Sequence, residues 1–217
     1  MKMPALVAIA FVTLAPGTAA LGQTTLLVSG GLNRASVTIS GDDADEVGDI
    51  GPVTRMWVGL AASVPVSEDW DLELGAGLSQ KGFGVIFDDF GFDFEASFEI
   101  DYFEITAYAG KSLPVADRIS VKLLVGPALA MRLSCRITAK TPEEEKTEDC
   151  DEDESRETDL GLGGGVRLRI GLSEEVGLTV GAFYTLGLPD LDEDDDFDIT
   201  IKSRALTLRA GLAFPIG

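Results

Sequence analysis

The chain has 217 residues, of which 37 are acidic and 17 basic, so its net charge at pH 7 is −20. Such acidity excludes nucleic acid as a partner, because binding to phosphates requires a basic surface. Hydrophobic residues make up 45% of the chain. Beyond the N-terminus, however, no apolar run approaches the ~20 residues that a membrane-spanning helix needs.

Residues 1–22 are predicted to be a signal peptide, which leaves residues 23–217 as the mature domain. Lys2 gives the segment a positive start, and an uncharged apolar stretch follows it. Small residues then permit cleavage after Ala20 or after Gly22. The protein is therefore expected to be exported.

The mature sequence contains eight stretches in which apolar residues alternate with small or polar ones, the two-residue period of a β-strand. The predicted strands cover residues 24–39, 53–65, 70–86, 97–113, 118–135, 158–172, 175–187 and 199–214. Strands in ordinary sheets average about 5–6 residues. The greater length found here suits strands that cross a membrane at a tilt.

The fifth stretch shows the alternation most clearly. One of its faces carries Leu123, Val125 and Leu129, whereas the other carries Gly126 and Ala128. An apolar outer face with small residues on the inner face is typical of a membrane barrel, in which one side of each strand contacts lipid.

Short and long connections alternate strictly along the chain. The short turns are 65–69, 114–117 and 173–175, and the long connections are 40–52, 86–98, 136–157 and 188–198. The long connections contain 26 of the 37 acidic residues. The sequence therefore predicts an all-β fold, an eight-stranded antiparallel up-and-down transmembrane beta-barrel with short periplasmic turns and long acidic outer loops.

Isolated charges on the small-residue faces predict a charge network inside the barrel. Its expected members are Glu73, Lys81, Glu104, Lys122, Arg132, Arg167, Arg169 and Arg209. The interior of an eight-stranded barrel is just wide enough for side chains to fill it, and buried charges need partners. We expect the two glutamates to neutralise part of the basic set; a charged pore or a proton path is the alternative interpretation.

Cys135 and Cys150 are the only cysteines of the chain. In an oxidising compartment they are expected to form a disulfide, and two unpaired thiols are the alternative.

The acidic loops offer hard oxygen ligands that suit divalent cations such as Ca²⁺. The candidate residues are Asp190, Asp192, Asp194, Asp196, Asp149, Asp151 and Asp153. The glycine and the distant glutamate of an EF-hand are missing from this pattern. The alternative is a solvated anionic surface.

The chain contains no histidine. This excludes mechanisms that use histidine as a general base or as a metal ligand. Paired carboxylates could still act as general acid and base. Because the acidic runs lie in loops without a visible pocket, however, no enzymatic activity is expected.

Several short motifs occur along the chain in an order typical of one family. They are Gly31-Leu32-Asn33, Leu72-Glu73-Leu74, residues 78–82, Tyr102-Phe103-Glu104-Ile105, residues 125–129, residues 159–166 and residues 181–184. In these motifs the chain resembles the PorT-like outer-membrane beta-barrel proteins. The resemblance implies a barrel of about eight strands in the cell outer membrane and a link to protein secretion, and it implies no catalytic residues.

We expect a structural or surface-interaction barrel that lies in outer-membrane lipid and meets the barrel-assembly machinery during insertion. An envelope protein is a candidate partner. An accessory subunit of a secretion or envelope assembly is the alternative, and a narrow pore is less favoured. Lys202 and Arg204 share the apolar face of the last strand, so they are expected at the outer membrane interface.

Overall fold

The computed structural model describes residues 23–41, 49–89, 92–140, 144–150, 157–188 and 199–216. The strands in these ranges are β1 Thr24–Gly41, β2 Asp49–Pro65, β3 Trp70–Asp89, β4 Phe92–Ala116, β5 Ile119–Lys140, β6 Glu145–Asp149, β7 Thr158–Gly171, β8 Gly177–Gly187 and β9 Ile199–Ile216. The predicted signal peptide lies outside the described residues. No helix in the described ranges is long and apolar enough to cross a membrane.

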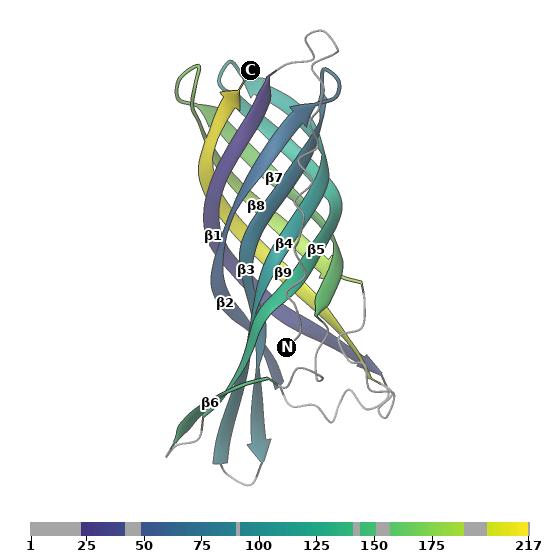
Figure 1. The fold of residues 1–217 in the computed structure, drawn as a ribbon, viewed down its shortest axis with the longest axis vertical. Coiled ribbons are helices and arrows are strands. Elements are labelled where there is room, and N and C mark those ends of the chain that lie inside the picture. Colours follow the sequence, from purple (N-terminus) through teal and green to yellow (C-terminus); the bar gives the residue numbers. More distant parts are fainter. Residues whose placement is uncertain are drawn as a thin grey trace, which may run out of the picture.

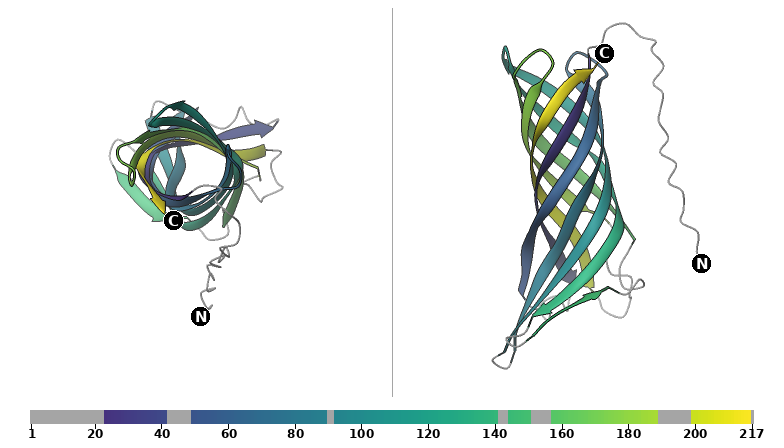
Figure 2. Two further views of the ribbon diagram at one scale, coloured as in Figure 1. Left: turned by 90° about the horizontal axis from the view of Figure 1, so that it is seen from above. Right: turned by 60° about the vertical axis from the view of Figure 1, so that its left-hand side comes forward.

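Eight of the strands form a closed antiparallel ring, which Figure 2 shows end-on. Consecutive ring strands pair with each other, β5 pairs with β7, and β1 closes the ring by pairing with β9. This seam runs without interruption from Thr24 opposite Ile216 to Gly41 opposite Ile199. The predicted antiparallel up-and-down barrel of eight strands is confirmed.

Side chains alternate between a lumen face and an outer face around the ring. In β5 the side chains of Leu123, Val125 and Leu129 are exposed on the outside, whereas those of Leu124 and Ala128 are buried inside. The predicted faces of this strand are confirmed. The exposed leucines and valines of the other strands continue the same belt, so the wall presents an apolar surface to its surroundings.

The long hairpins continue past the ring as an extension of the same sheet, here called the outer sheet and seen at the lower left of Figure 1. The outer sheet consists of residues 49–52 of β2, 83–89 of β3, 92–101 of β4, 134–140 of β5, and the whole of β6. In the sequence, 40–52, 86–98 and 136–157 are expected to be loops. That prediction is wrong for residues 40–41, 49–52, 86–89, 92–98, 136–140 and 145–149, which lie in strands. Pairing between β3 and β4 persists up to Asp89 opposite Phe92.

The stacked rings of Phe83 and Phe98, with centroids 4.6 Å apart, help to explain why the strands extend this far. Aromatic cross-strand pairs stabilise a sheet even where its other residues are charged. The acidic composition of these segments thus concealed strands that aromatic pairing supports.

Gly82 lies where the outer sheet departs from the ring. Its φ of 154° falls in a region that other residues rarely adopt, and a Cβ atom there would lie 1.9 Å from the carbonyl oxygen of Phe98. Pairing between β2 and β3 is interrupted between Pro52 and Trp57, at the same height. The backbone therefore requires glycine at the point where the wall opens into the outer sheet.

Candidate functional site

The described residues form two polar regions, one in the lumen and one on the outer sheet. In the lumen, Arg167 of β7 forms a double hydrogen bond with the carboxylate of Glu73 of β3, one arm of which measures 2.7 Å. Both side chains are buried. These strands are three places apart in the ring, so the ion pair spans the interior instead of following the wall.

A second set of charges crosses the lumen completely. The Glu104 carboxylate of β4 lies 3.6 Å from Arg209 of β9 and 3.5 Å from Lys81 of β3. Lys81 also lies 3.6 Å from Asp159 of β7. Because β4 and β9 stand on opposite sides of the eight-stranded ring, this chain of ion pairs bridges its full width.

Aromatic rings fill the space beside these charges. The Arg209 guanidinium lies 3.7 Å from the ring centre of Trp57 and 4.3 Å from that of Phe183, which are cation–π distances. Phe183 also stacks against Tyr108, with ring centres 6.3 Å apart. Glycine in the β7 wall makes room for them, because a Cβ atom on Gly165 would lie 2.6 Å from the Phe183 ring.

A third polar layer closes the periplasmic end. The Lys122 ammonium lies 2.8 Å from the Asp71 carboxylate and donates a hydrogen bond of 2.9 Å to Ser63. Ser63 in turn donates to Asp71 at 2.9 Å. The lumen thus contains paired charges at several heights.

The structure brings together six of the eight residues expected in the lumen network, Glu73, Lys81, Glu104, Lys122, Arg167 and Arg209. Arg132 lies half-buried near the outer end, opposite Tyr102. Arg169 is half-buried near the periplasmic end, opposite Ser120 and Thr179, and has no carboxylate partner among the described residues.

Sequence reasoning missed two acidic members of the network, Asp71 and Asp159. Alternation along the strand could have identified both. Asp71 lies two residues before Glu73, on the same inward face, and Asp159 lies on the inward face of β7 together with its glycines. Sequence reasoning also missed Asn33, which is fully buried and donates hydrogen bonds to Ser79 and to the Gln80 carbonyl.

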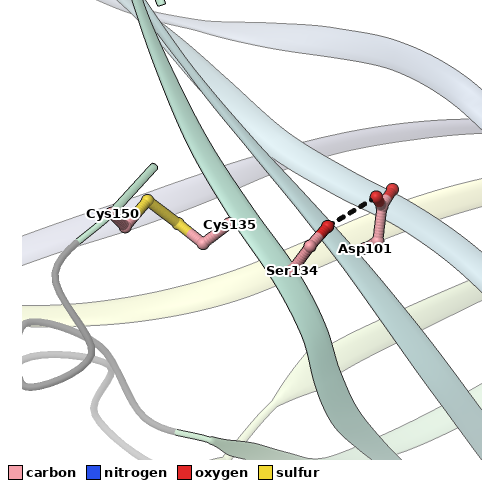
Figure 3. The surroundings of a disulfide bond; sticks show 4 residues. All are labelled: Asp101, Ser134, Cys135 and Cys150. Carbon is pink, nitrogen blue, oxygen red and sulfur yellow. Dashed lines mark hydrogen bonds between the residues drawn. A yellow bond between two sulfur atoms is a disulfide. The ribbon is translucent and has the colours of Figure 1, made fainter. Parts of the chain in front are cut away.

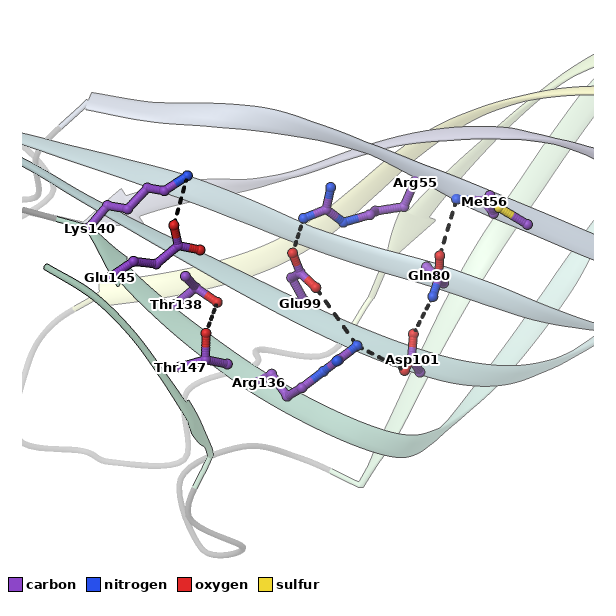
Figure 4. A network of polar contacts seen from close by, with 10 residues as sticks. All are labelled: Arg55, Met56, Gln80, Glu99, Asp101, Arg136, Thr138, Lys140, Glu145 and Thr147. Carbon is purple, nitrogen blue, oxygen red and sulfur yellow. Dashed lines mark hydrogen bonds and ion pairs between the residues drawn. The ribbon is translucent and has the colours of Figure 1, made fainter.

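The second polar region is a network on the outer sheet (Figure 4). Arg136 lies 3.8 Å from Glu99 and 3.9 Å from Asp101, and Arg55 forms an ion pair with Glu99. Gln80 links this network to the wall by donating a hydrogen bond of 2.9 Å to Asp101. Opposite charges therefore alternate across strands β2 to β5, a pattern that stabilises neighbouring strands.

Cross-strand contacts also attach β6 to β5. The hydroxyls of Thr138 and Thr147 lie 3.1 Å apart, and Lys140 lies 3.4 Å from Glu145. Within β6, a hydrogen bond from Lys146 raises its own pKa and lowers the pKa of Glu148. All of these side chains of β6 are exposed, so the strand presents a charged and solvated surface.

A disulfide between Cys135 and Cys150 holds β6 to the sheet (Figure 3). Its Cα atoms are 5.4 Å apart, and the Cys150 amide donates a hydrogen bond to the Cys135 carbonyl. The predicted disulfide is confirmed. The neighbouring Ser134 donates a hydrogen bond of 2.7 Å to Asp101, which ties the stapled segment to the polar network.

Replacing both Cys135 and Cys150 by serine is expected to loosen the outer sheet and leave the ring intact. The bond closes a loop of 15 residues, worth at most about 3 kcal/mol in the chain-entropy model. Limited proteolysis should cut near β6 much faster in the variant, while the strand amides of the ring keep their protection against hydrogen exchange. Equal cleavage rates in both proteins would contradict a stapling role.

Of the candidate cation ligands, Asp149 lies in β6 opposite Arg136. The other six, Asp190, Asp192, Asp194, Asp196, Asp151 and Asp153, lie outside the described residues. Within the described ranges there is no group of three acidic or cysteine side chains placed to hold a metal ion. Calcium binding by the acidic loops therefore stays a prediction.

The closed ring, its apolar outer wall and its charge-filled lumen define an integral β-barrel of the outer membrane. The sequence model of the outer membrane protein beta-barrel domain matches residues 23–193. The chain belongs to this family and is located in the outer membrane. Membership of the PorT-like proteins stays a prediction.

Solved structures that share the fold include those of OprG and OmpT. OprG from Pseudomonas aeruginosa is 12% identical, with 90% of this chain and 96% of that chain covered and a TM-score of 0.56. The outer membrane protease OmpT from Escherichia coli is 9% identical, with 89% and 97% covered and a TM-score of 0.50. No curated protein matches the sequence. Likeness at this level of identity establishes architecture alone.

Proposed function

We propose that the protein is a non-conducting, non-catalytic barrel that holds the outer sheet at the cell surface for contact with another macromolecule. The observation that supports this proposal is the lumen bridge from Arg209 through Glu104 and Lys81 to Asp159. Because the bridge crosses the ring at the level of the membrane, it obstructs the route that an ion would take.

The energetics favour a filled interior over a pathway. Each charge in the bridge has an opposite charge within 3.6 Å, so its desolvation is offset by attraction to its neighbour. An ion entering the lumen would have to separate these pairs. The rings of Trp57 and Phe183, which both lie against the Arg209 guanidinium, leave it little room to move aside.

The outer sheet has the properties of a docking platform. Its disulfide and cross-strand ion pairs hold the backbone before any partner arrives, which reduces the entropy lost on binding. Among the described strands, β6 pairs with β5 alone. Its second edge offers backbone groups to an added strand, a common mode of peptide recognition.

Conductance across a planar bilayer tests the sealed lumen. We expect the refolded protein to give no steps above background, because three layers of paired charge obstruct the lumen. Conductance should appear when all three layers are removed together, in a variant that carries alanine in place of Arg209, Glu104, Arg167, Glu73, Lys122 and Asp71. The control pair Lys140→Ala and Glu145→Ala changes a similar ion pair on the outer sheet and should stay silent. Steps of equal size in all three proteins would contradict the proposal.

The resemblance to PorT-like barrels supports a second candidate, an accessory subunit of a secretion or envelope assembly. Site-specific photo-crosslinking separates the two roles. A crosslinker at Thr147 on the outer sheet should capture a partner if the surface role is right, and one at Glu68 in a periplasmic turn should capture it if the accessory role is right. A peptide-cleavage assay completes the comparison with OmpT, and no cleavage is expected.

A further inference from the structure

Three basic side chains, Arg34 of β1 and Lys202 and Arg204 of β9, form a cluster on the outer wall, here called the basic rim patch. All three are exposed. Arg34 stands opposite Leu206 and Arg204 stands opposite Ser36, so the two arginines are diagonal neighbours on the lipid-facing side. Lys202 follows two residues further out on the same face.

The height of the patch places it at the outer edge of the membrane. Ile216, exposed at the periplasmic end, stands opposite Thr24, ten residues before Arg34. Ten residues of a strand tilted by about 40° rise about 25 Å, which is the height of the apolar band of such barrels. The arginines therefore lie at the level of lipid headgroups.

The wall beneath the patch is apolar. Leu32, Leu206 and Leu208 are exposed there. Tyr184, opposite Leu206 on β8, is exposed as well, and tyrosine is enriched where acyl chains meet headgroups. A cationic group directly above an apolar strip matches the two parts of an anionic lipid.

Charge around the rim is distributed unevenly. None of the three basic side chains has an ion-pair partner in the part of the chain that the structure describes. On the opposite side of the rim, Arg55 and Arg136 are already paired with the carboxylates of β4, Glu99 and Asp101. The basic rim patch is thus the side of the rim that attracts negative charge.

We propose that the basic rim patch binds the phosphate of an outer-leaflet lipid headgroup, with the acyl chains lying along the leucine strip below. Guanidinium groups suit this task because they donate paired hydrogen bonds to phosphate oxygens. Binding is direct and requires no bridging metal ion. The proposal is independent of the role of the outer sheet.

Unfolding of the refolded protein in vesicles tests the proposal. Phosphatidylglycerol added to phosphatidylcholine should raise the stability of the unaltered protein, and native mass spectrometry should detect phosphatidylglycerol that stays bound. In the triple variant Arg34→Gln, Lys202→Gln and Arg204→Gln, retention of this lipid should fall about tenfold or more, given that each basic residue contributes to attraction at an anionic surface.

The matched control is Arg136→Gln, Lys140→Gln and Lys146→Gln, which removes the same charge from the outer sheet and should leave lipid retention unchanged. Equal loss in both triple variants would overturn the proposal, since net charge alone would explain it. The proposal would also be overturned if the triple variant lost as much stability in pure phosphatidylcholine as in vesicles with phosphatidylglycerol. That result would mean that the three cations form ion pairs with carboxylates of the chain itself. Displacement of the lipid by inorganic phosphate at constant ionic strength would identify a free-anion site instead.

Discussion

Replacing Glu73 by methionine is expected to lower the free energy of unfolding by about 3–5 kcal/mol, because Arg167 is then left charged and buried without its partner. The arginine is held by both carboxylate oxygens of Glu73, and its other close neighbour is the ring of Phe183. An aromatic ring stabilises a buried guanidinium charge far less than a carboxylate does. Equilibrium unfolding in urea, with the barrel in lipid vesicles, measures the loss.

The double variant Glu73→Met and Arg167→Met distinguishes the effect of an unpaired buried charge from the effect of altered packing in the lumen. An apolar pair of similar volume is expected to restore most of the stability, since replacing both members of a buried ion pair is often close to neutral. Glu68→Met, in an exposed turn, is the control for loss of a carboxylate and should change stability little. If the single and double variants are equally unstable, the pair is not the source of the effect.

Replacing Leu123 by arginine is expected to cost about 2–4 kcal/mol in the membrane-inserted form. Leu123 is 45% exposed on the outer wall, in the middle of the apolar belt, between Val121 and Val125. A charge at this height faces the hydrocarbon core of the bilayer. Urea unfolding of the vesicle-bound barrel measures the cost.

The same substitution at Leu133 is the matched control. Leu133 also faces outward on β5 but lies at the outer end of the belt, beside the register shift between β4 and β5. An arginine there reaches the interface, so the expected cost is about 0–1 kcal/mol. Equal costs at the two positions would show that the outer face of β5 does not lie across the bilayer.

The ring was predictable because strand period and loop length are local properties of the sequence. The outward position of Leu123 and the inward position of Ala128 follow from simple alternation. The outer sheet was not predictable in the same way. Its strands depend on cross-strand partners such as Phe83 and Phe98, and an acidic segment carries the same local signal whether it is paired or not.

The lumen network shows the same limit of prediction for single residues. Alternation identifies Glu104 and Arg209 as inward-facing. It does not specify that they meet across the ring, because that depends on the tilt and stagger of all eight strands. Asp159 was overlooked as a partner of Lys81 for the same reason. The outward position of Lys202 and Arg204, by contrast, follows directly from parity along β9.

The pairing of β1 with β9 makes the two ends of the domain each other's neighbours. The other ring pairs join strands that follow one another closely in the chain, whereas this seam brings together Thr24 and Ile216. Contacts between distant residues form slowly, because a long loop must close first. A polypeptide that stalls before Ile199 would remain an open sheet with two reactive edges. The ring of this protein can therefore close only after its final strand, β9, has been synthesised and has paired with β1.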